Sequence, residues 1–302
     1  MIMMLLIIIS NITAATSGDE VKIDYLGQAT PGTNPLVFAP GIVSNPGTIE
    51  YAGAFSPDGR SYYFTRRQKI RSDQRIWVTD FKIGKWTSPR IADFARDHMS
   101  YEPVFSPDGK RLYFGSQRPF REKPESETLT FFWYLEKKND GWSQAQLMNP
   151  ILRSELPSYI SIAADGSIYF GSYQHKGIRL ARIVNGQYQA AGSVSAKIDA
   201  FPGAGHPYIS PDQSYLLFDS RAGMVNYGTF DIFITFRDRD GSWTTAINIG
   251  KVINSPEAEL CPSVSPDGKF LFFNRWGRNN ESDIYWVRAD FIGEMKKKAL
   301  GQ

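Results

Sequence analysis

Few side chains in this sequence are suited to a shared chemical site, and the clearest set comes from aligning the chain on a recurring turn. Six positions before the aspartate of each turn stand Ala52, Glu102, Tyr159, His206 and Cys261. A carboxyl group, a phenol and an imidazole at equivalent positions of a repeat can bond one polar ligand if the repeats surround a common axis. Glu102, Tyr159 and His206 are therefore the first candidate binding residues.

A second set of candidates follows the second predicted strand of the repeats. It comprises Arg66, Arg118, Arg221, Arg275 and Trp276, with Arg67, Gln117 and Tyr173 in the same loops. Arginine forms bidentate bonds with oxyanions, and aromatic rings stack on ligands and cations. If these loops share a mouth with the first set, they predict a pocket for an acidic or sugar-like small molecule, or for a segment of a protein partner.

These residues also have structural interpretations. An arginine after a strand can pair with an acid of a neighbouring repeat, such as Asp231 or Asp283. The aspartates of the recurring turns are expected to shape those turns. Cys261 is interpreted as a small buried side chain rather than as a nucleophile.

Catalysis is the alternative to binding, as a glycoside hydrolase or lyase. A glycoside hydrolase needs two carboxyl groups at a defined separation. The aligned ring contains one, Glu102, while Glu50 and Glu259 stand two residues earlier in register. Glu102 and His206 could also act as an acid–base pair. Because no motif accompanies this pair, we predict a binding protein and assign no catalytic residue.

Composition narrows the possible partners and cofactors. The 302 residues include 34 Lys and Arg against 31 Asp and Glu, which gives a net charge of +3. A charge balance this even does not indicate binding to nucleic acid or to an anionic membrane. A single cysteine excludes an internal disulfide and a cysteine-built zinc site, and three histidines leave little for a metal centre. We expect neither a metal nor another cofactor.

The turn that underlies the alignment is an internal repeat. Ser-Pro-Asp-Gly occurs at 56–59, 106–109 and 265–268, with the degenerate copies Ala-Ala-Asp-Gly at 163–166 and Ser-Pro-Asp-Gln at 210–213. Proline presets φ and glycine accepts the left-handed conformation after a type I turn, so each copy predicts a tight hairpin. Gln213 occupies the glycine position, where a left-handed backbone costs about 1 kcal/mol.

Each turn is followed by elements in the same order. A run of three bulky apolar residues comes first, as in Tyr62-Tyr63-Phe64, and indicates a strand covered on both faces. A third strand, a turn that combines glycine with an aromatic residue, and a short fourth strand follow. We find no long helical pattern. The sequence therefore predicts an all-β chain of repeated four-stranded sheets.

The two ends of the repeat region complement each other. The last unit lacks a fourth strand, whereas residues 35–43 precede the first turn with no strands before them. We predict that this N-terminal strand pairs into the C-terminal sheet, which removes free sheet edges. The expected fold is a five-bladed β-propeller over residues 30–292, with six blades as the alternative.

The motif Phe-Ser-Pro-Asp-Gly-Arg/Lys at 55–60 and 105–110, and its copy at 265–269, resembles the WD40-like PD40 repeat. That repeat is best known from the C-terminal propeller of TolB, and the resemblance implies a β-propeller. The N-terminal domain of TolB has no counterpart here, so its partners are not carried over. Propellers of this kind also precede serine peptidase domains, but no Gly-x-Ser-x-Gly elbow follows in this sequence.

The N-terminus has the character of a targeting segment. Met1 to Ile9 are all apolar, too few for a bilayer span of ~20 residues, and Ala14-Ala15 follow soon after. We predict a signal peptide over 1–15, a leader over 16–29 and a C-terminal tail over 293–302. The expected protein is periplasmic or secreted, monomeric, and without a stable membrane anchor.

Overall fold

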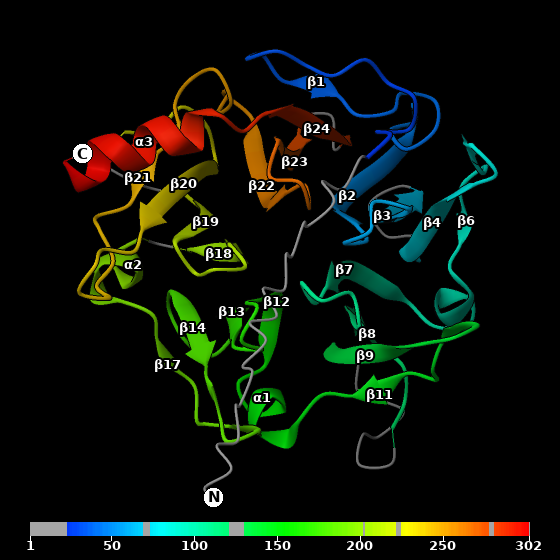
Figure 1. Cartoon of the computed structure of the whole chain (residues 1–302), viewed down its shortest axis with the longest axis horizontal. Coiled ribbons are helices and arrows are strands. Elements are labelled where there is room, and N and C mark those ends of the chain that lie inside the picture. The colour runs from blue at the N-terminus through cyan, green and yellow to red at the C-terminus, as the bar shows by residue number, and fades with distance from the viewer. Residues whose placement is uncertain are drawn as a thin grey trace, which may run out of the picture.

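The computed structural model of the chain describes residues 23–68, 73–120, 130–201, 203–221, 225–277 and 281–301. β-strands dominate this part of the chain, and the sheets surround a central axis (Figure 1). The predicted signal peptide, residues 1–15, lies outside the described residues.

The strands form antiparallel four-stranded units in sequence order. Unit 1 comprises β2 (Thr48–Phe55), β3 (Ser61–Gln68), β4 (Arg75–Lys82) and β6 (Arg90–Ile91). Unit 2 comprises β7 (Ser100–Phe105), β8 (Arg111–Ser116), β9 (Phe131–Lys138) and β11 (Gln146–Leu147). Unit 3 comprises β12 (Pro157–Ile162), β13 (Ile168–Ser172), β14 (Ile178–Ala181) and β17 (Gly192–Ser193). The first strand of each unit lies nearest the axis (Figure 1).

Unit 4 comprises β18 (Gly205–Ile209), β19 (Tyr215–Ser220), β20 (Asp231–Phe236) and β21 (Ile247–Asn248). Unit 5 combines β22 (Ala258–Val264), β23 (Phe270–Trp276) and β24 (Ser282–Arg288) with β1 (Leu36–Val37) from the N-terminal region. In this pairing Leu36 lies opposite Trp286, and the Phe38 amide donates to the Ile284 carbonyl at 2.7 Å.

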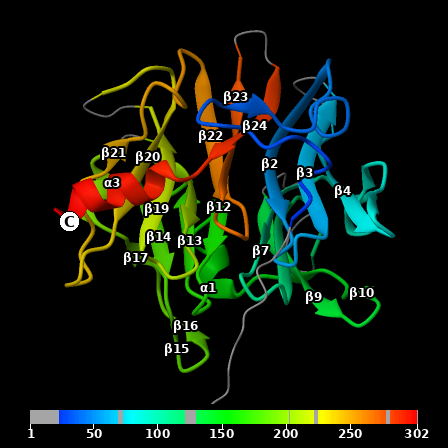
Figure 2. The same ribbon diagram turned by 45° about the horizontal axis from the view of Figure 1, so that its top comes forward.

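The connections contain short elements outside these units. Small hairpins are made by β5 (Lys85–Trp86) with β4, by β10 (Gly141–Trp142) with β9, and by β15 (Ile183–Val184) with β16 (Gln187–Tyr188). Residues Asp93–Ala95 form a 3₁₀ turn, and α1 (Pro150–Arg153) and α2 (Ala196–Asp199) are single-turn helices. In Figure 2 the β15–β16 hairpin projects at the lower edge of the view, and Tyr188 in it donates to the Gly166 carbonyl in the turn of unit 3 at 3.2 Å.

The recurring tetrapeptides form the hairpin turns between the first two strands of the units. The serine hydroxyl donates to the aspartate carboxylate, at 2.5 Å from Ser56 to Asp58 and 2.7 Å from Ser265 to Asp267. Gly59 and Gln213 have φ of 67° and 58°. Gln213, at the glycine position of the motif, is therefore left-handed.

The hydrophobic core is divided among the interfaces between successive units. Between units 1 and 2, for example, Tyr63 and Ile76 pack with Phe114 and Trp133 in one buried cluster. The bulky runs after the turns are buried on both sides, as expected for strands between neighbouring sheets.

Two terminal segments differ from the sequence-based expectation. The described part of the predicted leader, from Ile23 onward, enters the core, because Tyr25 packs with Phe55 and Trp286 and its hydroxyl donates to Asp267 at 2.7 Å. Most of the predicted tail lies in helix α3 (Phe291–Leu300), which ends at Gly301 with φ of 67°. Ile292 in α3 is buried against units 4 and 5, so this helix covers part of the ring.

Candidate functional site

The inner strand of each described unit contains a shift in register at, or in unit 3 one residue before, the position that the sequence alignment singled out. In unit 2 the shift lies between Tyr101 and Val104, and in unit 4 between Gly205 and Tyr208. The other units have it at Tyr51/Ala54, Pro157/Tyr159 and Leu260/Ser263. Such β-bulges re-aim side chains and are common beside functional sites. Ala52, Glu102, His206 and Cys261 thus lie in bulges, whereas Tyr159 directly follows one.

The bulges hold unusual backbone. Glu102, His206 and Cys261 have φ of 57°, 39° and 53°. A left-handed conformation at a residue with a side chain costs of the order of 1–3 kcal/mol and persists only where the surroundings enforce it. The ring is therefore a defined feature of the scaffold.

The polar members of this ring lie together. The His206 Nδ1 atom is 2.8 Å from Asp219 Oδ2, and the Tyr159 and His206 rings meet edge to face with centroids 5.2 Å apart. Tyr159 also packs with Cys261 in a small buried cluster. The predicted residues Glu102, Tyr159 and His206, which come from units 2, 3 and 4, are thus brought to one place.

Glu102 is the ionisable group in the most unusual environment. Its side chain is buried, and the Oε2 atom has no hydrogen-bond partner among the described residues. Burial raises the pKa of Glu102 to about 7, with His206 lowering it and Asp219 raising it. A carboxyl group with this pKa is part protonated at neutral pH, so it can donate or accept a hydrogen bond.

Asp219 determines the state of the histidine. Burial acts to lower the pKa of His206, but the Asp219 carboxylate outweighs it and holds the pKa well above the ordinary value of 6.5. His206 is therefore an imidazolium at neutral pH. Burial raises the pKa of Cys261 to about 11, so this thiol stays protonated and unreactive.

Asp219 was missed by the sequence analysis. It occupies a position on the second strand, directly after the bulky run, where the other units have Thr65, Gly115, Gly171 and Asn274. Thr65 Oγ1 accepts the amide of Glu102 at 2.8 Å, and Asp219 Oδ2 accepts the amide of Cys261 at 3.1 Å. This position therefore supports the bulge of the following unit, and an acid among small or neutral residues was the available signal.

Tyrosines surround the cluster. Tyr173 is 75% exposed. Partial burial of its hydroxyl, and then the charge of Glu102, raise the pKa of Tyr173, whereas the charge of His206 lowers it. Tyr101 lies beside Glu102 as well, because Glu102 adds to the effect of burial in raising its pKa. The site thus combines one carboxyl, one imidazolium and aromatic surface, of which Tyr173 is open to solvent.

The predicted arginines have structural partners. Arg66 Nε lies 2.7 Å from the buried Glu50, and Arg275 Nε lies 2.7 Å from the buried Glu259. Each also donates to a backbone carbonyl, that of Val43 at 2.7 Å and that of Ile253 at 2.8 Å, respectively. The expected partners, acids of a neighbouring repeat, are replaced by acids on the adjacent strand of the same unit.

The remaining predicted residues behave differently from one another. Arg118 is buried over the Phe114 and Trp133 rings and donates to the Phe94 carbonyl at 2.8 Å. Arg221 is exposed, with its guanidinium 4.8 Å from the centre of the Phe230 ring. Trp276 is partly exposed and is covered by the guanidinium of Arg67 at 5.1 Å. Among these arginines, only Arg221 offers an exposed cation.

A separate cavity lies at the ends of the inner strands that carry the hairpin turns. It has a volume of about 220 Å³, and its lining includes Pro57, Pro107, Pro211 and Pro266 from the turns together with Val104 and Ile209. Tyr159 also lines it. Since Tyr159 contacts His206 as well, it stands between the apolar cavity and the polar cluster.

Two classes of feature are missing from the described part of the chain. No group of three histidine, cysteine or acidic side chains there is arranged to hold a metal ion. None of its helices has the length and apolar character that a membrane crossing requires.

Known structures share the fold. The catalytic domain of the GH62 α-L-arabinofuranosidase of Coprinopsis cinerea matches with a TM-score of 0.52 and 7% identity, over 85% of this chain and 97% of that chain. The α-L-arabinofuranosidase of Podospora anserina, solved with cellotriose, matches with a TM-score of 0.51 and 9% identity, over 85% and 97%. The chain is accordingly a β-propeller, and identities this low indicate the fold alone.

TolB from Acinetobacter baumannii also matches, with a TM-score of 0.48 and 14% identity over 80% of this chain. The chain spans 57% of the length of that protein. No protein-family model and no curated protein sequence matches the chain. Membership of the PD40 repeat family therefore stays a prediction.

Proposed function

We propose that the chain is an exported, five-bladed β-propeller that binds a sugar-like ligand at the mouth of its central channel. The five units correspond to blades, and β1 closes the ring by completing the last one. The pairing of β1 with β24 supports this closure, as does Phe38, which packs against Phe55 of unit 1 and Phe272 of unit 5. Export rests on the apolar start of the sequence, Met1 to Ile9.

The observation that carries the ligand proposal is the environment of Glu102. A sugar hydroxyl is both donor and acceptor, and the unpartnered Oε2 of a carboxyl with a pKa of about 7 can serve either role. The imidazolium of His206 adds a fixed donor beside it. Tyr173 supplies an exposed aromatic surface on which a sugar ring can lie.

A neutral polar ligand is favoured over an acidic one. Arg66 and Arg275 are paired with the buried Glu50 and Glu259, so they are engaged in the scaffold. The cations that we assign to the channel mouth are therefore His206 and the exposed Arg221.

A carbohydrate-active enzyme is the second candidate, because the pKa of Glu102 suits a general acid at neutral pH. Binding remains the first choice on account of Asp219. That carboxylate is buried, and one of its oxygens, Oδ2, meets both His206 and the Cys261 amide. Its Oδ2 atom thus supports the ring, and its Oδ1 atom, which has no hydrogen-bond partner among the described residues, is fully buried. Glycoside hydrolysis instead needs a second carboxyl that can reach the substrate or its water.

Saturation-transfer NMR with L-arabinose, arabinobiose and cellotriose tests the proposal. We expect binding of at least one of these sugars. Glu102→Leu should weaken it about tenfold and Tyr173→Ala about fivefold, as losses of the hydrogen bonds of the carboxyl group and of one stacking contact. Ile83→Ala, which changes a fully exposed side chain, is the control.

Two results would overturn the proposal. Sugar binding that is unaffected by Glu102→Leu would place the ligand elsewhere, and no binding of any of the three would remove the ligand class. Hydrolysis of 4-nitrophenyl α-L-arabinofuranoside that Glu102→Gln abolishes without lowering the melting temperature would establish the enzyme instead.

A further inference from the structure

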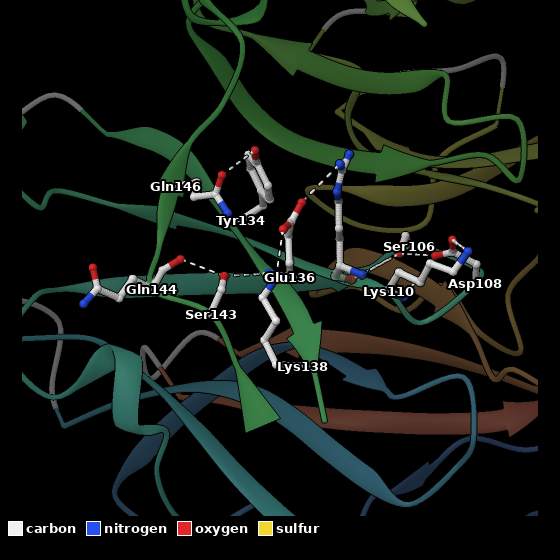
Figure 3. Close-up of polar contacts among 10 residues, drawn as sticks. Ser106, Asp108, Lys110, Tyr134, Glu136, Lys138, Ser143, Gln144 and Gln146 are labelled. Atoms are coloured by element: carbon white, nitrogen blue, oxygen red, sulfur yellow. Dashed lines mark hydrogen bonds and ion pairs between the residues drawn. The ribbon is translucent and has the colours of Figure 1, made fainter. Parts of the chain in front are cut away.

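A groove between units 2 and 3 is independent of the channel site. It lies at the hairpin turns and has a volume of about 440 Å³. One wall comes from unit 2 and is charged, with Lys110 in the turn and Glu136 and Lys138 on β9 (Figure 3). The opposite wall comes from unit 3 and is mainly apolar, formed by Ile162, Ala163, Ala164, Ile183 and Tyr188.

Side chains bridge the corresponding interfaces on either side of this groove. Between units 1 and 2, Trp142 Nε1 donates to the Tyr63 hydroxyl at 3.1 Å, and the cavity there measures about 190 Å³. Between units 3 and 4, Gln213 accepts from the Tyr169 hydroxyl at 2.8 Å. Tyr113 has the same place in unit 2 as these tyrosines, but its hydroxyl interacts with Arg111 of its own unit. The groove therefore stays open.

The degenerate turn of unit 3 explains why there is room. Ala163 and Ala164 stand where the regular motif has serine and proline, and both line the groove. In unit 2 the corresponding Ser106 and Pro107 line it from the other side. Two smaller side chains at this turn enlarge the space between the walls.

The charged wall carries more positive than negative groups. Lys110, Arg111, Lys137 and Lys138 line the groove against two acids, Asp108 and Glu136. Glu136 is shared by Arg111 and Lys138, each at 3.4 Å, and Lys110 lies 3.6 Å from Asp108. A strong charge-assisted bond is about 2.7–2.9 Å long. These cations are thus loosely paired and can turn to an anion.

We propose that this groove binds a small ligand in which an oxyanion is attached to an apolar ring. The oxyanion lies between Arg111 and Lys138, in competition with Glu136. The ring lies against Ile162, Ile183 and Tyr188 on the opposite wall. Affinity therefore requires both parts of the ligand, and the ligand differs in class from the neutral sugar proposed for the channel mouth.

Phenyl phosphate is the probe for this site, with inorganic phosphate and phenol as its separate halves. We expect NMR titration of the full-length protein to shift the amides of Ala164 and Gly166, with phenyl phosphate binding at least fivefold tighter than either half. Arg111→Gln and Lys138→Gln should each weaken binding about five- to tenfold. Glu136→Gln should strengthen it about threefold, because the competing carboxylate is removed.

The controls separate this site from general charge effects. Lys85→Gln, on the outer hairpin of unit 1, removes an exposed cation from a unit that does not line the groove and should leave the affinity unchanged. The proposal is wrong if phenyl phosphate does not shift these amides, or if one half binds as tightly as the whole. It is equally wrong if Lys85→Gln weakens binding as much as Arg111→Gln, or if Glu136→Gln weakens it.

Discussion

The carboxylate of Asp219 lies 2.8 Å from the imidazole of His206, on the neighbouring strand of the same unit, and also accepts the backbone amide of Cys261 from the next unit at 3.1 Å. One buried acid thereby pairs with the charged His206 side chain and also bonds the bulged backbone of the next unit. The channel site depends on this arrangement, because the imidazolium of His206 acts on Glu102.

Stability should fall as the pH rises, because two groups act in the same direction. The pKa of Glu102 is raised from 4.5 to about 7, so the folded state holds its proton more tightly and loses stability as the pH rises through this range. The pKa of His206 is raised, so its contribution is present below about pH 6.5 and lost as pH rises through the folded-state value. Urea unfolding should show about 2–3 kcal/mol less stability at pH 8 than at pH 5.

Glu102→Gln provides the control for this pH dependence. The variant lacks the titrating carboxyl, so the part of the difference between pH 5 and pH 8 that Glu102 causes should disappear while the part due to His206 remains, and the variant should be more stable than the wild-type protein at pH 8. An unchanged pH dependence in the variant would show that Glu102 titrates normally.

Asp219→Asn should lower the pKa of His206. The amide keeps the size of the side chain but removes the charge that outweighs burial of the imidazole. NMR titration of the His206 ring protons measures the shift directly, and we expect a loss of about 2 kcal/mol in unfolding free energy at pH 6. Asp93→Asn, an exposed change, is the control. A His206 titration unaffected by Asp219→Asn would contradict the pairing.

Arg275→Met should destabilise the protein without weakening ligand binding. It leaves the carboxylate of Glu259 buried without its cation, which costs about 3–5 kcal/mol. The double variant with Glu259→Gln should recover part of this loss in urea unfolding. Arg221→Met, at an exposed arginine, should change stability by less than about 0.5 kcal/mol. A large loss of sugar affinity in Arg275→Met would return this residue to the binding site.

Phe38→Ala tests the closure of the ring. Phe38 is fully buried and contacts Tyr62 of unit 1 and Trp286 of unit 5, so its loss leaves a cavity where the N-terminal segment joins the two. We expect a loss of about 3–5 kcal/mol in unfolding free energy. A change below about 1 kcal/mol would mean that the N-terminal segment is not part of the cooperative fold.

The repeated turns and strands could be predicted from the sequence because their signals are local. Proline and glycine in each tetrapeptide determine a hairpin, and bulky runs such as Tyr62-Tyr63-Phe64 identify strands covered on both faces. Counting these signals also places Glu102, Tyr159 and His206 at equivalent positions. The ring of candidates was accessible for that reason.

The partners of the arginines could not be predicted in the same way. Arg66 and Arg275 meet Glu50 and Glu259 across an antiparallel pair, and the register that brings them together depends on turn length and on the bulge between them. The role of Asp219 likewise depends on which backbone amide the bulge leaves without a partner in the sheet. Sequence spacing contains neither piece of information.

The terminal segments show a different limit. Tyr25 reaches Asp267 from 242 residues away, so no local pattern marks it as part of the core. Helix α3 did have local signals, including Glu294 paired with Lys297 and a glycine at its end. A single helix after a long series of strands has no counterpart in the repeat, so the repeat pattern does not indicate it.

The protonation of Glu102 tests the central claim most directly, since the proposed ligand contact depends on it. Carbon-13 NMR of the glutamate side-chain carboxyl groups, titrated from pH 4 to pH 9, resolves its pKa, with Glu102→Gln assigning the signal. The proposed site predicts a pKa of about 7. A value near the ordinary 4.5 would show a solvated, conventional carboxylate and would contradict the proposed site.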